Sequence, residues 1–167
     1  MNRPLVAIVM GSESDLTVMN ESAIILDKFN VPYEVKVASA HRSPGLVHEF
    51  SKGAEDAGFE VIIAGAGGAA HLPGVIAAET VLPVIGVPID SSPLNGFDSL
   101  LSIVQMPAGV PVATMAVGVA GARNAALLAI QILSRKDVTL LTQLKQYKND
   151  MADAIEKKQE ARNKKQE

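Results

Sequence analysis

The chain of 167 residues contains no cysteine and no tryptophan. Without cysteine it can form no disulfide bond, no thiolate metal site and no cysteine nucleophile. Aromatic residues make up only 4% of the chain while apolar residues make up 48%, so the core must consist mainly of Ala, Val, Ile and Leu. The formal net charge of -3 offers no basic surface for a nucleic-acid backbone, and we expect no nucleic-acid partner.

The sequence also lacks a recognisable targeting or membrane segment. The apolar run at residues 5–10 is too short for a signal peptide. No charged residue lies between Asp98 and Arg123, a length that would cross a bilayer, but Pro107 and Pro111 interrupt this stretch. We expect a helix, a turn and a buried strand there, and hence a cytoplasmic protein with no membrane partner.

Five short apolar runs rich in β-branched residues predict five strands, at residues 5–10, 33–38, 61–66, 84–87 and 112–117. Between the strands, apolar residues recur at helical spacing. Examples of that spacing are Leu16, Met19, Ala23 and Leu26, and then Leu46, Val47, Phe50, Ala54 and Ala57, followed by Gly58 as a C-terminal cap. Uniformly apolar strands that alternate with helices are typical of a parallel, doubly wound sheet covered on both faces.

The region from residue 61 to residue 122 contains no Lys or Arg. The helices predicted at 72–80 and 97–105 within it are apolar around most of their circumference. One sheet cannot cover both sides of such helices, so other subunits must do so. We predict an obligate homo-oligomer.

The character of the chain changes after Ser134. Apolar residues at helical spacing then mark one face of a long helix at about 138–155, namely Leu140, Leu144, Tyr147, Met151 and Ile155. No strand follows, so we expect this helix to pack on a neighbouring subunit. Residues 156–167 hold no large apolar side chain and are expected to form a charged, disordered tail, which leaves residues 1–155 as a single domain.

A polar loop follows the first predicted strand and contains Ser12, Ser14 and Asp15. Each of these side chains is a common cap for the next helix. Together with free backbone N–H groups they also suit a phosphate or a ribose. The loop is not a P-loop, because the Gly-Lys-Ser/Thr ending is missing.

The loop after the second strand places His41 beside Arg42, ahead of Pro44 as the start of a helix. A single histidine at a strand end is usually structural. Arg42, however, is the only basic residue in the loops after the first three strands, and a guanidinium suits bidentate phosphate binding. His41 could then carry a proton at neutral pH.

The loop after the third strand runs from Gly65 to Ala70 and matches the dinucleotide fingerprint GxGxxA. That fingerprint normally follows the first strand and is answered by an acidic residue at the end of the next one, whereas here Asp90 lies beyond a later strand end. We interpret the glycines as allowing close approach to a smaller ligand. His71 either contacts that ligand or holds the loop by a hydrogen bond.

Other kinds of site find little support in the sequence. The three histidines are dispersed without metal-ligand spacing, and His48 lies in a helical pattern as a surface residue. No GxSxG nucleophile motif occurs. What remains is a phosphate-binding pocket with one good proton carrier.

These loops resemble, over about residues 5–135, the class I N5-carboxyaminoimidazole ribonucleotide mutases of purine synthesis. The resemblance rests on residues 9–15, 39–42, 64–74, 86–88 and 100–107. It implies a flavodoxin-like three-layer α/β/α sandwich with a parallel five-stranded sheet, a homo-octamer, a site shared between subunits, a small ribonucleotide substrate, and neither a metal nor another cofactor.

The resemblance also implies the roles of individual residues. His41 would be the acid/base, and Ser12, Asp15 and Arg42 would bind the ribonucleotide. Other matching positions that line the family's site are Ser14, Ser39, Gly68, Ala70, His71 and Leu72. The implied reaction is an isomerisation: the carbamate loses carbon dioxide, the imidazole C4 captures it, and the histidine removes the C4 proton.

Three alternatives remain. A related class carboxylates aminoimidazole ribonucleotide directly with carbon dioxide, but it tends to have Lys at the position of Arg42 and departs from the run at 64–74, so we favour the mutase. A non-catalytic flavodoxin-like nucleotide-binding module and a dinucleotide-dependent oxidoreductase are the others.

Overall fold

A computed structural model describes residues 3–91 and 93–163 of the chain. Its five strands form one parallel sheet in the order β2-β1-β3-β4-β5. The strands are β1 (Val6–Met10), β2 (Tyr33–Val37), β3 (Val61–Gly67), β4 (Val84–Ile89) and β5 (Ala113–Thr114). The predicted doubly wound parallel sheet is therefore confirmed.

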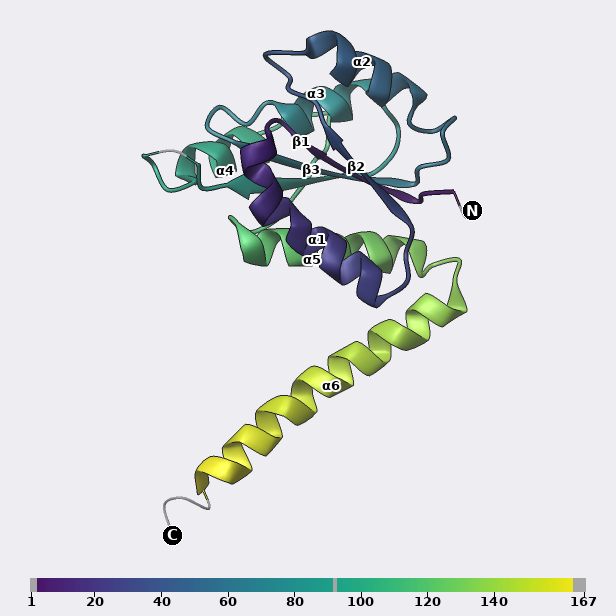
Figure 1. The fold of residues 1–167 in the computed structure, drawn as a ribbon, viewed down its shortest axis with the longest axis vertical. Coiled ribbons are helices and arrows are strands. Elements are labelled where there is room, and N and C mark those ends of the chain that lie inside the picture. The colour runs from purple at the N-terminus through teal and green to yellow at the C-terminus, as the bar shows by residue number, and fades with distance from the viewer. Residues whose placement is uncertain (1–2, 92, 164–167) are drawn as a thin grey trace.

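Helices cover both faces of this sheet (Figure 1). In chain order they are the short 3-10 helix η1 (Glu13–Asp15), α1 (Leu16–Lys28), α2 (Pro44–Gly53), α3 (Leu72–Glu79), α4 (Phe97–Val104), α5 (Val119–Leu133) and α6 (Val138–Asn163). Helices α1 and α5 lie on one face, and α2, α3 and α4 lie on the other. The result is the three-layer α/β/α sandwich that the sequence predicted.

The central strands β1, β3 and β4 are uniformly apolar because each one supplies two cores, whereas the edge strand β2 contains Glu34 and Lys36 and is largely exposed. Alternate side chains of β1 point in opposite directions, with Ile8 packed in the α1/α5 core and Val9 in the α2/α3/α4 core. All five residues of β1 are fully buried. Burial of a large aliphatic side chain contributes roughly 1.5–3 kcal/mol to the free energy of unfolding. The central strands therefore give the loops at their ends a stable support.

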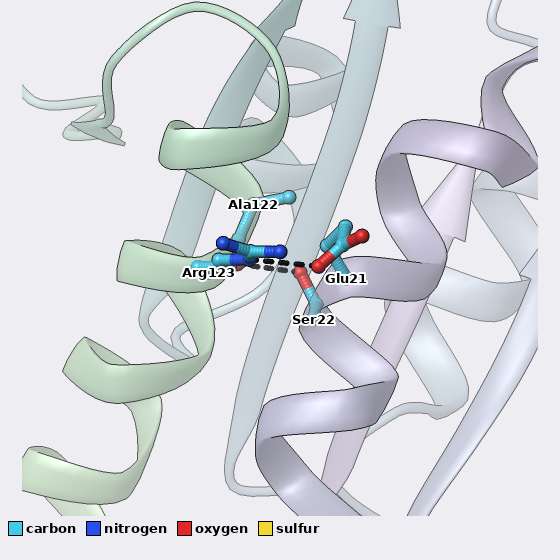
Figure 2. A network of polar contacts seen from close by, with 4 residues as sticks. All are labelled: Glu21, Ser22, Ala122 and Arg123. Atoms are coloured by element: carbon cyan, nitrogen blue, oxygen red, sulfur yellow. Dashed lines mark hydrogen bonds and ion pairs between the residues drawn. The ribbon is translucent and has the colours of Figure 1, made fainter.

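Polar contacts lock α1 to α5 on one face of the sheet (Figure 2). The buried Ser22 hydroxyl donates a hydrogen bond to the carbonyl of Ala122 at 2.7 Å. Beside it, the Arg123 Nε lies 2.7 Å from a carboxylate oxygen of Glu21. These contacts fix the first turns of α5 against α1, so the two helices form one rigid support under the sheet.

Two predicted elements are shorter than the sequence indicated. Strand β5 has only two residues of the six expected at 112–117. Beyond it, the Met115 N–H bonds to the Gly86 carbonyl and the Gly118 N–H bonds to the Pro88 carbonyl. Gly118, with a positive φ of 75°, then leads into α5. Helix α2 ends at Gly53 with Ala54 as its C-cap, earlier than the end predicted before Gly58. Residues 54–57 form a turn, and Gly58 follows that turn with a φ of 95°.

Helix α6 begins at Val138, where the Asp137 carboxylate accepts hydrogen bonds from two N–H groups of its first turn. Leu140 and Leu144 are buried against the rest of the chain, and Tyr147 packs beside them. Beyond this point the helix projects away from the sandwich (Figure 1). Among the described residues, no helix is long and apolar enough to span a bilayer.

The expectation of a disordered tail is wrong for residues 156–163, which continue α6 as far as Asn163. This segment contains Glu, Lys, Gln, Ala and Arg, which are strong helix formers, and it has no Gly or Pro. A hydrogen bond of 3.0 Å from Gln159 to Asn163 supports its last turn. The expected tail at 164–167 lies outside the described residues.

Candidate active site

The loops after β1, β2 and β3 meet at one edge of the sheet, as the sequence predicted. Together they line a cavity of about 280 Å³. Its lining residues are Gly11, Ser12, Asp15, Ser39, Ala40, His41, Arg42, Ala66, Gly67, Ala70, His71, Leu72 and Ser91. Most of the candidate site residues are therefore brought together, although Ser14 and Gly68 are not among the lining residues.

In the first loop, only one of the polar residues, Ser12, caps a helix with its side chain. The Ser12 hydroxyl caps η1 and accepts hydrogen bonds from the N–H of Ser14 at 3.4 Å and from its hydroxyl at 2.9 Å. Asp15 occupies the N-cap position of α1 but makes no side-chain capping bond. The capping alternative therefore applies to Ser12, while the carboxylate of Asp15 lines the cavity.

Asp15 is only 6% exposed. Burial raises the pKa of its carboxyl group above the ordinary value. The Ser14 hydroxyl, the Ser12 backbone and the Arg42 charge act in the opposite direction and offset part of this effect. A buried carboxylate that makes no capping bond to its helix is an acceptor available to a ligand hydroxyl.

In the second loop, two serines close the turn that presents His41 and Arg42. The Ser39 N–H donates to the Ser43 hydroxyl at 2.9 Å, and that hydroxyl donates to the Ser39 carbonyl at 3.2 Å. Pro44 then starts α2, as predicted. The loop is thus braced by its own hydrogen bonds.

The guanidinium of Arg42 bridges the ends of β1 and β2. Its Nη2 donates to the Gly11 carbonyl at 2.7 Å, and its Nε donates to the Ser39 hydroxyl at 3.4 Å. A second cavity of about 350 Å³ shares Arg42 with the first and is also lined by Glu13 and Ser43. An arginine has five N–H donors, so further donors of Arg42 are available to an anion.

In the third loop, Gly65 makes room for a protein side chain, whereas Gly67 lines the cavity, where the close approach of a ligand stays a prediction. A Cβ on Gly65 would lie 2.3 Å from the sulfur of Met19 in α1. Gly68 has a φ of 58° and Ala70 has a φ of 41°, so the chain turns sharply before α3. The GxGxxA match therefore reflects packing and a tight turn.

The histidines of the second and third loops are in contact. His41 Nε2 and His71 Nδ1 are 2.6 Å apart, and the two rings meet edge to face with centroids 4.7 Å apart. His71 stands at the N-cap position of α3 without capping it. One ring nitrogen must donate and the other accept, so the two rings are joined by a hydrogen bond whose direction depends on their tautomers.

One lining residue, Ser91, escaped the sequence analysis, because the loop after β4 carried no recognisable motif. The strand order puts β4 beside β3, and this neighbourhood was the only signal available. His48 lies outside the cavity, where it pairs with Glu79 at 2.9 Å and its side chain is 62% exposed. Its interpretation as a surface residue is confirmed.

The doubly wound parallel sheet has the architecture of a flavodoxin-like α/β protein. An arginine, a buried carboxylate and a histidine pair lie at its carboxyl edge, and such a group of side chains suits a small anionic ligand. Comparison with known proteins narrows this class. The chain belongs to the AIR carboxylase family, whose model matches residues 5–154.

Curated relatives in this family are similar over most of their length. The N5-carboxyaminoimidazole ribonucleotide mutase of Pyrococcus abyssi is 64% identical over 148 residues, which is 89% of this chain and 84% of that protein. The mutase of Bacillus subtilis is 58% identical over 153 residues, or 92% and 94% of the two chains. The crystal structure of Treponema denticola PurE matches with a TM-score of 0.83 at 31% identity, covering 93% of this chain and 96% of that one.

Proposed function

We propose that the chain is an N5-carboxyaminoimidazole ribonucleotide mutase, an isomerase of purine biosynthesis. It moves a carboxylate from the exocyclic N5 to ring carbon C4 of an imidazole ribonucleotide. The observation that carries this assignment is that His41 and Arg42 come from one braced loop and line one cavity, in a chain 58% to 64% identical to relatives named as this mutase.

The two adjoining cavities suggest how the substrate lies. Arg42 takes part in both, and the cavity lined by Glu13 and Ser43 contains no histidine. A phosphate beside Arg42 would leave the imidazole ring in the cavity that His41 and His71 line. Ser12 and Asp15 then stand where a ribose would connect the two parts.

The other proposed binding residues act around this substrate. Ser39 and Leu72 line the cavity, and Ala70 contributes at the turn before α3. Ser14 acts indirectly, because its hydroxyl bonds to Ser12 and Asp15. Gly68 has no lining position, so its role is the positive φ that lets the loop turn toward α3.

The proposed reaction has two bond changes and one proton transfer. The bond from N5 to the carboxylate carbon breaks and its electrons return to the aminoimidazole, which frees carbon dioxide. Ring carbon C4 attacks that carbon dioxide and forms the new bond. His41 donates a proton to N5 as the first bond breaks and removes the C4 proton after the new bond forms, so one proton moves from C4 to N5 overall. His71, 2.6 Å from His41, can share that proton.

Confinement supplies much of the rate enhancement in this scheme. Holding carbon dioxide against C4 converts a bimolecular step into one within the cavity. Positioned acid/base catalysis adds roughly 10²- to 10⁴-fold. The aminoimidazole itself supplies the electrons, so the proposed scheme uses no bound cofactor.

The test is conversion of N5-carboxyaminoimidazole ribonucleotide to its C4 isomer, without ATP or added bicarbonate, by wild type and His41→Asn. Turnover by wild type alone supports both the reaction and the histidine role. His48→Asn is the matched control, because His48 lies outside the cavity and should retain full activity.

The family description names a second activity, carboxylation of aminoimidazole ribonucleotide. The same assay separates the two. If wild type acts only on aminoimidazole ribonucleotide with bicarbonate, the chain is a direct carboxylase and the mutase proposal fails.

We also infer a homo-oligomer, most simply an octamer, in the cytoplasm. Helix α4 exposes Phe97, Leu101 and Val104, which lie on one side of the helix. Met151 and Ile155 on α6 are 48% and 66% exposed. We propose that neighbouring subunits cover both surfaces around a single domain of residues 1–155.

Light scattering tests this assembly. An octamer of the 17.5 kDa chain would have a mass of about 140 kDa, eight times the monomer. A chain that remains a 17.5 kDa monomer at micromolar concentration would contradict the inference.

A further inference from the structure

A fourth strand end reaches the active site. Strand β4 pairs with β3 along its length, and Ile89 stands opposite Gly67 in the last pair of the ladder. The next residues carry the chain over the end of β3. Ser91, two residues beyond β4, lies beside Gly67 and lines the same cavity as His41 and His71.

Gly67 makes the space that Ser91 occupies. A Cβ on Gly67 would lie 1.8 Å from the Ser91 Oγ and 2.9 Å from the Ser91 Cβ, which is far inside van der Waals contact. Gly67 is not among the glycines with positive φ, so the backbone conformation itself does not require glycine. The missing side chain at position 67 therefore serves to admit the hydroxymethyl group of Ser91.

The base of the loop that follows β4 is tied down, and Ser91 near that base lines the cavity. The buried Ser99 hydroxyl lies 3.0 Å from the Ile89 carbonyl and 2.9 Å from the Gly96 carbonyl, so it holds the end of β4 and the start of α4 together. Within the described part of the chain, the Ser91 hydroxyl itself has no hydrogen-bond partner. A positioned hydroxyl without a protein partner is available to a ligand.

The position of Ser91 indicates which part of the ligand it meets. The cavity on the far side of Arg42 includes neither Ser91 nor Gly67 nor either histidine of the pair. Ser91 therefore belongs to the end of the site where the imidazole would react, away from the guanidinium that would hold the phosphate.

We infer that the Ser91 hydroxyl donates a hydrogen bond to the carboxylate that is transferred, and that it helps to retain the one-carbon unit between its release from N5 and its capture at C4. This inference rests on the proposed mutase function. It adds a substrate contact from β4 to the contacts proposed for the first three loops.

The test compares wild type with Ser91→Ala in a buffer that contains ¹³C-labelled bicarbonate. Both the rate of isomerisation and the fraction of product that carries the label are measured. Wild type should retain the original carbon and incorporate little label. Loss of a hydrogen bond to a charged group should lower kcat/KM of Ser91→Ala roughly tenfold or more and raise the labelled fraction.

Ser102→Ala is the matched control, because Ser102 in α4 loses the same hydroxyl but lies outside the cavity and bonds only to the carbonyl of Asp98. It should match wild type in rate and in label. Gly67→Ala supplies an independent test, because its Cβ must displace Ser91 and should raise the labelled fraction while the serine is still present.

The outcomes are distinct. Unchanged rate and label in Ser91→Ala would overturn the inference, and so would a slower rate with unchanged label, which would indicate a purely structural role. If wild type itself converts no N5-carboxyaminoimidazole ribonucleotide, the proposed function fails and this inference fails with it.

Discussion

The two halves of the active site are built in different ways. The polar half, residues 11–15 and 39–43, is held by hydrogen bonds among its own serines and by the bond from Arg42 to Gly11. The glycine half, residues 65–72 with Ser91, consists mainly of Gly and Ala and is shaped by close packing against Met19 and by turns. We therefore expect the polar half to select the ligand by charge and hydrogen bonding, and the glycine half to select it by the shape of the cavity.

This contrast implies different responses to mutation. A change in the polar half removes a binding group from a loop that keeps its shape. A change in the glycine half alters the shape of the cavity and the stability of the protein together. The variants below test this difference.

The largest effect is expected from Arg42→Met, which removes the only Lys or Arg among the described residues that line either cavity. Loss of charge-assisted hydrogen bonds worth about 1.5–3 kcal/mol should raise KM by roughly 10- to 100-fold. The melting temperature should fall only slightly, because Arg42 is exposed and the variant loses only its surface hydrogen bonds to Gly11 and Ser39. Steady-state kinetics measure the effect.

Arg123→Met is the control for Arg42→Met, because Arg123 in α5 pairs with Glu21 in α1 at 2.7 Å and lines neither cavity. It should leave KM unchanged. An Arg42→Met enzyme with the KM of wild type would show that the anion does not bind at this guanidinium.

The next effect concerns the contact that joins the two halves. His71→Leu removes the ring whose Nδ1 lies 2.6 Å from His41 Nε2. We expect kcat to fall by roughly tenfold, the value of one hydrogen bond of about 1.4 kcal/mol, while KM stays within about twofold. His71→Asn, which keeps polar atoms on the side chain, should recover part of the loss. Equal kcat in wild type and His71→Leu would contradict a shared proton.

The glycine half should respond through stability. In Gly65→Ala the new Cβ would lie 2.3 Å from the Met19 sulfur, so the methionine must move within a filled core. Overpacking of this kind costs about 1–3 kcal/mol, which denaturant unfolding measures. The double variant Gly65→Ala with Met19→Val, which removes the clashing sulfur, should be more stable than Gly65→Ala. If it is not, the glycine serves another purpose.

Much of the polar half could be predicted from the sequence. Asp15 follows a uniformly apolar strand, while His41 and Arg42 follow the run at 33–38, where Tyr and Val alternate with Glu and Lys. The carboxyl ends of neighbouring parallel strands meet at one edge. In these loops the residue types themselves indicate the function, because charged and hydroxyl side chains bind a limited range of ligand groups.

Less of the glycine half could be predicted. The sequence does not show which atoms occupy the space beside a glycine. The packing of Gly65 against Met19 and of Gly67 against Ser91 can therefore be seen only in the folded structure. The continuation of α6 through 156–163 was missed for a different reason. Its residues favour a helix individually, but the absence of an apolar face suggested disorder.

The smallest expected effect is that of Asp15→Asn on stability. It concerns a residue of the polar half that should affect both ligand binding and the stability of the fold. Burial raises the pKa of Asp15 above its ordinary value of 3.8. The folded chain thus holds this proton more tightly than the unfolded chain does. The resulting stabilisation is present below the unfolded pKa and is lost as pH rises through the folded pKa, so ionised Asp15 weakens the fold at neutral pH.

Asp15→Asn should therefore melt at a higher temperature than wild type at pH 7, and the difference should shrink as pH falls toward 4, since the carboxyl is then increasingly protonated. Asp56→Asn, at an exposed position, is the control and should show no such trend. Calorimetry at several pH values measures both. If Asp15→Asn is more stable but binds the ribonucleotide more weakly, the charge of Asp15 serves ligand binding and lowers the stability of the fold. If Asp15→Asn is less stable than wild type, the carboxylate instead stabilises the polar half of the site.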